Sequence, residues 1–295
     1  MSNAVESGHG SLGGAASGRE ESLRRALLAS RPRGARRAEA GLPERTGERV
    51  VGVEAESPRS DARTLAGWID HTILLPEATE ADIRRVAREA REAGCASTCV
   101  NGRFVPVAAE ELIGSRTVVC AVVGFPLGAM PPGVKAFEAS WVVERGAKEV
   151  DMVLALGDLK GGNDYAVWHE IHGVREAVGD DVRLKVILET GLLEDGEKVV
   201  AAQIAVAAGA DFVKTSTGFG HGGATVEDVR LLRAAVGEDV GVKASGGIAS
   251  YEDAVRMLAA GADRLGMSRT LAVLAEAEQA TARDMGSERV QGTRA

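Results

Sequence analysis

Three short segments decide the fold of this chain: RLKVILE at residues 183–189, DFVKTS at residues 211–216 and VGVKAS at residues 240–245. Each is rich in apolar or β-branched side chains and is short enough for one β-strand. Each also carries one lysine, and Lys185, Lys214 and Lys243 follow one another at intervals of 29 residues. Such an interval fits a strand, a helix and the next strand, so the segments are predicted to be consecutive parallel strands. Their three lysines are then expected at equivalent heights, pointing to the same interior.

The same alternation extends outward from these segments, beginning near Asp61. Helical periodicity is clearest at Glu80–Ala93 and Tyr251–Ala260, and several helices are followed by a glycine, as at Ala93-Gly94 and Ala260-Gly261. A glycine there suits the left-handed position that ends a helix. The predicted strands are Gly67–Leu75, Ser97–Asn101, Thr117–Phe125, Glu149–Ala155, Arg183–Glu189, Asp211–Ser216, Val240–Ala244 and Asp263–Met267.

This order of elements favours a closed parallel barrel. An open doubly wound sheet is the alternative, and it would be expected to carry a glycine-rich dinucleotide turn after its first strand. The first predicted strand instead ends Asp70-His71-Thr72-Ile73-Leu74. Eight strands alternating with eight helices over roughly 225 residues fit a (β/α)₈ TIM barrel, an α/β fold.

The chain outside the barrel differs in composition. Residues 1–60 are rich in Gly, Ser and Arg, and they predict a disordered N-terminal extension that buries too little apolar surface to fold. An Arg-rich interaction arm is the alternative interpretation of this segment. The barrel domain is predicted to span residues 61–285, and residues 286–295 are expected to form a C-terminal tail.

Composition narrows the class of protein. The net charge of −8 argues against a nucleic-acid partner, because phosphate backbones select basic surfaces. The chain has no apolar run near the roughly 18 residues that span a membrane, and no secretory signal pattern opens it. Its three cysteines are an odd number, which disfavours a disulfide framework. These features predict a cytoplasmic protein with no nucleic-acid or membrane partner.

The lysines in the predicted strands indicate a catalytic site. Only seven of the 35 basic residues are Lys, so a lysine inside an apolar strand is more informative than usual. Burial next to another cation favours the neutral amine, which can attack a carbonyl carbon. The alternative is that each lysine is paired with a carboxylate such as Asp151 or Glu189, or reaches outward. Lys214 precedes a Thr-Ser-Thr-Gly loop and Lys243 an Ala-Ser-Gly-Gly loop, and physical reasoning alone does not rank the two lysines.

Six motifs in the correct order then resemble the deoxyribose-phosphate aldolase family, from about Leu65 to Leu274. They are Asp70-His-Thr72, Val123-Gly-Phe-Pro-Leu-Gly128, Gly146-Ala-Lys-Glu-Val-Asp151, Leu184-Lys-Val-Ile-Leu-Glu-Thr190, Gly209-Ala-Asp-Phe-Val-Lys-Thr-Ser-Thr-Gly-Phe219 and Val242-Lys-Ala-Ser-Gly-Gly247. The resemblance implies a lyase that reversibly cleaves 2-deoxy-D-ribose 5-phosphate to D-glyceraldehyde 3-phosphate and acetaldehyde, in deoxyribonucleotide catabolism.

The resemblance also implies roles for residues. Lys214 would form the Schiff base, Lys243 would depress its pKa, and Asp151, helped by an ordered water, would shuttle the proton. Lys185, Asp70 and Cys99 would support this site, although a small core side chain is the simpler interpretation of Cys99. The phosphate would be held by backbone N–H groups in the last loops, at Gly218, Gly246 and Gly247 and near Gly266 and Ser268. Arg269 departs from the small or hydroxyl residues common there, and its role stays open.

The family reaction needs no metal and no cofactor, so none is expected. The expected partners are a small sugar phosphate and a second copy of the chain in a dimer. Two alternatives stay open. One is another lysine-dependent barrel aldolase, transaldolase-like or ketose-cleaving, and the other is a non-catalytic barrel that only binds a sugar phosphate.

Overall fold

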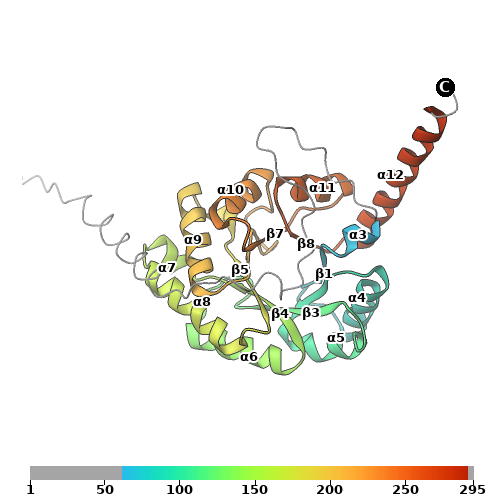
Figure 1. The fold of residues 1–295 in the computed structure, drawn as a ribbon. Coiled ribbons are helices and arrows are strands. Elements are labelled where there is room, and N and C mark those ends of the chain that lie inside the picture. Colours follow the sequence, from blue (N-terminus) through green and yellow to red (C-terminus); the bar gives the residue numbers. More distant parts are fainter. Residues whose placement is uncertain (1–61, 292–295) are drawn as a thin grey trace, which may run out of the picture.

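The computed structural model describes the backbone of residues 62–291 and the side chains of residues 62–283. Within them, eight parallel strands close into one barrel in the order β1 to β8, with helices outside (Figure 1). The strands are β1 Ile69–Ile73, β2 Ser97–Asn101, β3 Val118–Val123, β4 Ala147–Val153, β5 Arg183–Ile187, β6 Phe212–Lys214, β7 Gly241–Ser245 and β8 Arg264–Met267. The predicted TIM barrel is confirmed, and the extension predicted at residues 1–60 lies outside the described residues.

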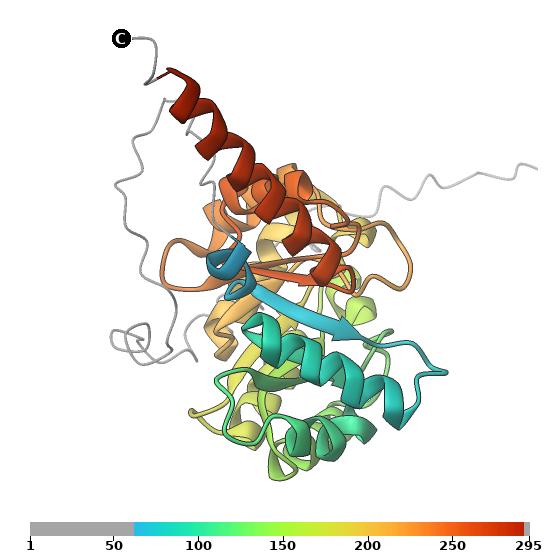
Figure 2. The ribbon, with the colours of Figure 1, turned by 90° about the vertical axis from the view of Figure 1, so that its right-hand side faces the viewer.

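Helices follow the strands and cover the outside of the barrel. They are α3 Ala62–Ala66, α4 Glu80–Ala93, α5 Val105–Glu111, α6 Pro132–Glu144, α7 Leu156–Lys160, α8 Asp164–Val178, α9 Asp195–Ala208, α10 Val226–Val236, α11 Tyr251–Ala260 and α12 Thr270–Gln291. Short 3₁₀ turns lie at Gly102–Phe104 and Thr190–Leu192. The helix α12 extends well beyond the barrel (Figure 2), and the predicted domain boundary at residue 285 falls inside it.

Local sequence explains where the helices begin and end. Thr79 and Ser250 each accept a hydrogen bond from the backbone of the third helical residue, which caps α4 and α11. Gly94 and Gly261 end the same helices in the left-handed conformation, at φ 76° and 115°. Both helices therefore have the bounds that their periodicity and caps predicted.

Seven of the eight strands differ from their predicted bounds, and two of them, β4 and β6, carry candidate site residues. β4 begins at Ala147 rather than Glu149, because pairing with β3 continues past a register irregularity at Val119 and Cys120. β6 ends at Lys214 rather than Ser216. The residues after Lys214 leave the ladder to form the loop above the barrel, so its lysine lies at the very end of the strand. That end is the catalytic side in TIM barrels.

None of the helices in the described part of the chain is both long and apolar enough to cross a membrane.

Candidate active site

The lysines enter the barrel interior from neighbouring strands. Lys214 and Lys243 are register partners of β6 and β7, so they lie at equivalent heights as the sequence predicted. Lys185 does not, since its register partner on β6 is Phe212, two residues before Lys214. The prediction of three lysines at one height is therefore wrong for Lys185, which lies one layer deeper because the register between β5 and β6 is offset.

Asp151 on β4 joins all three lysines. Its Oδ2 atom lies 2.9 Å from Lys214 Nζ and 2.7 Å from Lys243 Nζ, and its Oδ1 atom lies 2.8 Å from Lys185 Nζ. The sequence left open whether the lysines are paired with carboxylates, and the structure shows that they are. Glu189, the other carboxylate considered, instead accepts hydrogen bonds from Thr217 and so braces the loop after Lys214.

Below Asp151, a second set of charges fills the barrel. Asp70 on β1 contacts Lys243, and its Oδ1 atom lies 2.6 Å from Arg264 Nη1 on β8. Glu149 on β4 lies 2.6 Å from Lys185 Nζ and 3.2 Å from Arg264 Nη1. These side chains are buried. Buried charges of this kind require partners, and this lower set supplies them to the lysines above.

The contacts set the protonation of the network. Burial would raise the pKa of Asp151, but the three surrounding ammonium groups outweigh it and hold that pKa well below its usual range. Burial would lower the pKa of Lys243, but the Asp151 and Asp70 carboxylates raise it above its ordinary value. Asp151 is therefore ionised and Lys243 protonated at neutral pH.

The interior set carries an excess of positive charge. Among the described residues inside the barrel, Lys185, Lys214, Lys243 and Arg264 face three carboxylates. The number of carboxylate contacts differs, with three at Lys185, two at Lys243 and one at Lys214. A cation excess in a buried site favours a neutral amine and attracts anions.

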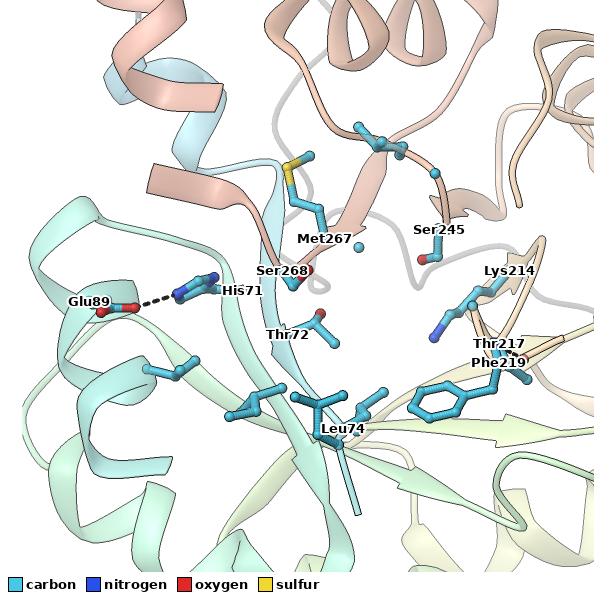
Figure 3. Close-up of a pocket in the computed structure, with 18 of the residues that line it drawn as sticks. His71, Thr72, Leu74, Glu89, Lys214, Thr217, Phe219, Ser245, Met267 and Ser268 are labelled. Carbon is cyan, nitrogen blue, oxygen red and sulfur yellow. Dashed lines mark hydrogen bonds and ion pairs between the residues drawn. The ribbon is translucent and has the colours of Figure 1, made fainter. Parts of the chain in front are cut away.

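A cavity of about 520 Å³ opens above this network, and Lys214 is the one network lysine that lines it. Figure 3 shows Lys214, Thr72 and Ser245 facing the same space, with Leu74 and Phe219 at one side. His71 lies at the far side, where its Nε2 atom is 3.0 Å from Glu89 Oε2. Asp151, Lys243, Asp70 and Lys185 lie beneath the cavity and do not line it.

All five residues predicted to bind phosphate line this cavity, namely Gly218, Gly246, Gly247, Gly266 and Ser268. Gly246 and Gly247 have φ values of 88° and 78°, a conformation that disfavours other residues. At Gly266 a Cβ atom would lie 2.3 Å from Ser245 Oγ and 3.0 Å from Lys243 Cε. Glycine therefore keeps the backbone close to the lysines and leaves room above them.

Ser245 and Arg269 differ in their relation to the cavity. Ser245 Oγ is buried and has no hydrogen-bond partner among the described residues, so it is free to bind a ligand. Arg269 is exposed and is not among the residues that line the cavity. The structure thus does not include Arg269 in the wall of the cavity.

Sequence reasoning missed three members of the network, Glu149, Arg264 and Cys120. The Cys120 thiol donates to Asp151 Oδ1 at 3.1 Å and accepts from Lys185 Nζ at 3.3 Å. A strand period of two carried the available signal, because Glu149 precedes Asp151 by two residues and so faces the same interior. The same period marked Arg264, which precedes the predicted Gly266 by two residues on β8, although its partner Asp70 is 194 residues away in the chain.

Known proteins are similar to this chain over most of its length. The model of the DeoC/LacD family aldolases matches residues 64–275. The chain belongs to this family. A deoxyribose-phosphate aldolase from Streptococcus gordonii is 55% identical over 207 residues, which cover 70% of this chain and 94% of that protein. One from Carboxydothermus hydrogenoformans is 54% identical over 213 residues, or 71% and 93% of the two chains.

A solved structure agrees with this membership. The tetrameric deoxyribose phosphate aldolase from Aeropyrum pernix is 38% identical, with a TM-score of 0.68 over 72% of this chain and 91% of that one. The chain is thus an aldolase of the lyase class on the TIM-barrel fold, and the alternative of an unrelated open sheet is excluded.

Two groups of side chains in the described residues have metal-ligand spacing, Cys99 with Cys120 and Asp151, and Cys120 with Asp70 and Glu149. Every carboxylate in them already contacts a lysine or arginine of the network. A metal cation there would have to displace those ammonium and guanidinium groups, so the donor set does not suit one.

Proposed function

We propose that this aldolase cleaves 2-deoxy-D-ribose 5-phosphate through a Schiff base on Lys214. The observation that carries the proposal is the placement of Lys214 at the cavity, with its Nζ atom 2.9 Å from Asp151 and its register partner Lys243 beside it. The similarity to named deoxyribose-phosphate aldolases, above 50% identity over almost their whole length, supports this choice of substrate.

The three lysines have different roles because they lie at different positions relative to the cavity. The Lys214 amine, with one carboxylate contact, attacks the C1 aldehyde of the open-chain sugar, and loss of water gives an iminium ion. Lys243 lies below the cavity and stays protonated between Asp70 and Asp151. Lys185 and Asp70 hold Asp151 and Lys243 in place.

Asp151 is the group that accepts and returns the proton. Its carboxylate, through an ordered water, takes the C3 hydroxyl proton as the C2–C3 bond breaks, and the bonding electrons move into an enamine on Lys214. D-Glyceraldehyde 3-phosphate leaves, the enamine is protonated at C2, and hydrolysis releases acetaldehyde and the free amine. The low pKa of Asp151 keeps its carboxylate ionised at neutral pH, and the adjacent ammonium groups that lower this pKa favour release of the proton once it has been taken up.

The phosphate of the substrate binds over the last two strands. Backbone N–H groups near Gly218, Gly246, Gly247 and Gly266, with the hydroxyl of Ser268, surround the end of the cavity beside Ser245. Loops after the seventh and eighth strands hold phosphate in many TIM barrels. The positive excess beneath the cavity adds attraction for a dianion.

The proposal extends to assembly and location. A homodimer is supported by exposed apolar side chains on α6 and the loop before it, since Leu127 and Phe137 are 73% and 69% exposed. Three free cysteines suit a reducing cytoplasm. Light scattering on the purified chain tests the dimer, and a monomer at micromolar concentration would contradict it.

The decisive experiment combines turnover with trapping. Wild type should cleave deoxyribose 5-phosphate, and Lys214→Ala should not. Borohydride with acetaldehyde should leave an ethyl group on Lys214 by peptide mass mapping. Trapping lost only in Lys243→Ala would reverse the assignment of the two lysines.

Two other outcomes separate the alternatives. Cleavage of a ketose phosphate but not of deoxyribose 5-phosphate would favour another aldolase of this fold. Tight binding of deoxyribose 5-phosphate by wild type without turnover would favour a non-catalytic binding barrel.

A further inference from the structure

Two cysteines lie side by side under the cavity. Cys99 on β2 and Cys120 on β3 are register partners on adjacent parallel strands. Both side chains are completely buried, and their sulfur atoms lie within 4.8 Å of each other and of an Asp151 carboxylate oxygen. Adjacent strands are about 4.8 Å apart, which falls within the Cα separation that a disulfide allows. The two sulfurs can therefore reach bonding distance mainly by side-chain rotation.

The pair is connected to the proposed proton shuttle. Cys120 Sγ lies 3.1 Å from Asp151 Oδ1, to which it donates, and 3.3 Å from Lys185 Nζ. Asp151 Oδ1 is thus held by one thiol and one ammonium group, while Oδ2 faces Lys214 and Lys243. A change at Cys120 therefore reaches Asp151 directly.

The surroundings of Cys99 make it the more reactive thiol. Contact with Cys120 lowers the pKa of Cys99, burial and the Asp151 carboxylate oppose this effect, and the charges of Lys243 and Lys214 reinforce it. Cys95 provides the contrast in the same chain, because burial and Asp70 raise its pKa to about 12. Thiolates rather than thiols react with peroxides, so Cys99 should react first.

A thin apolar layer separates the pair from the cavity. Leu74 and the partly buried Phe125 pack against the two cysteines. Leu74 also lines the cavity, and so does Phe219, whose ring meets Phe125 edge-on at 5.2 Å. Figure 3 shows Leu74 and Phe219 together at the side of the cavity below Lys214. A small oxidant in the cavity is thus one side chain away from Cys99.

We propose that Cys99 and Cys120 form an oxidation site, at which hydrogen peroxide produces a disulfide that stops aldol cleavage. The Cys99 thiolate attacks one peroxide oxygen, the O–O bond breaks, and Cys99 sulfenic acid and hydroxide form. Cys120 then attacks the Cys99 sulfur, the S–O bond breaks, and its thiol proton and the departing oxygen leave as water. The two thiols lose two electrons and two protons, and the peroxide becomes two waters.

Disulfide formation would disturb Asp151. Cys120 would lose the hydrogen that it donates to Asp151 Oδ1, and its sulfur would move toward β2. Asp151 would then be held at Oδ1 by Lys185 alone, and its alignment with Lys214 would change. A misplacement of about 1 Å in a catalytic site costs on the order of 100-fold in rate. A dithiol reductant would reverse the loss, as expected for a disulfide.

The experiment treats the full chain with hydrogen peroxide and follows intact mass, thiol alkylation under denaturing conditions, and the retro-aldol rate. Cys95→Ala is the matched control. Wild type and Cys95→Ala should each lose the mass of two hydrogens and about 100-fold in rate, and dithiothreitol should restore both. Peptide mapping should find Cys99 joined to Cys120. The Cys99→Ala variant should keep its own untreated rate after the same exposure.

Three results would overturn the proposal: a disulfide with no loss of rate, loss of rate with all three thiols still open to alkylation, or equally fast inactivation of Cys99→Ala. Cys120→Ala adds a separate check, because its Cys99 should gain oxygen instead of forming a cross-link. The rate readout rests on the proposed function, but the mass and mapping readouts do not. A chain that fails to cleave deoxyribose 5-phosphate before treatment would contradict the function while the cross-link remained testable.

Discussion

Asp151 and Glu149 offer a matched pair of substitutions that separates catalysis from stability. Both carboxylates lie on β4, both are buried, and each contacts three cationic groups. Asp151 reaches Lys214, whereas Glu149 contacts Lys185, Arg183 and Arg264 below. Asp151→Asn and Glu149→Gln each remove one buried negative charge and keep the side-chain shape.

The expected costs follow from these contacts. Removing one partner from a buried ion pair destabilises a protein by about 3–5 kcal/mol, which lowers Tm on the order of 10 °C for a domain of this size. Both variants should lose stability in this range. Loss of a proton-transfer group costs about 10²–10⁴ in rate, and we expect that loss for Asp151→Asn only. Glu149→Gln should stay within about tenfold of wild type, since it touches no group at the cavity.

The assays are urea unfolding at neutral pH and the retro-aldol rate at a temperature where both variants remain folded. Equal rate losses in the two variants would refute the distinct role of Asp151, because the loss would then follow the shared damage to the network. Unchanged stability in both would refute the claim that these carboxylates balance the buried lysines.

Three further outcomes are expected. Gly266→Ala should lower the free energy of unfolding by about 1–3 kcal/mol and remove much of the activity, because its Cβ atom would overpack against Ser245 and Lys243. Gly173→Ala, which has open space inside α8, should raise the free energy of unfolding by up to about 1 kcal/mol. Equal effects of the two variants in urea unfolding would contradict this. Lowering the pH below about 5 should reduce the free energy of unfolding. The pKa values of Asp151 and Asp70 are lower in the folded than in the unfolded chain, so the unfolded chain binds protons first, near pH ~3.9. A free energy of unfolding that stays constant between pH 5 and 3 would contradict this prediction. Treatment with EDTA should leave kcat/KM for deoxyribose 5-phosphate unchanged, and a loss restored by a divalent metal would show that the lysine mechanism is incomplete.

The sequence predicted the barrel and its lysines because both depend on local pattern. Short apolar segments, helical periodicity and terminal glycines placed the strands, and a constant interval placed Lys214 and Lys243 on neighbouring ones. These features can be recognised in the sequence without knowing how neighbouring strands are aligned. Choosing Lys214 over Lys243 needed the family motifs, and the cavity agrees with that choice because it exposes Lys214 alone of the network lysines.

The partners of the lysines could not be predicted in the same way. The depth of Lys185 depends on the offset between β5 and β6, and Arg264 meets Asp70 only because the barrel closes β8 onto β1. Sequence patterns assigned Cys120 no role, and only its contact with Asp151 marks it as part of the site. Closure and register are properties of the whole sheet, so single segments do not contain them.

The charges inside the barrel are divided between its two halves. Strands β1 to β4 supply the carboxylates Asp70, Glu149 and Asp151, and strands β5 to β8 supply the cations Lys185, Lys214, Lys243 and Arg264. Each half alone would present a surface of one sign, which repels itself and prefers water. Only when the halves meet do the opposite charges find partners, so closure of the barrel and assembly of the lysine cluster are one event. A chain divided between β4 and β5 would leave the interior carboxylates on one fragment and the interior cations on the other, and salt would weaken the attraction between them.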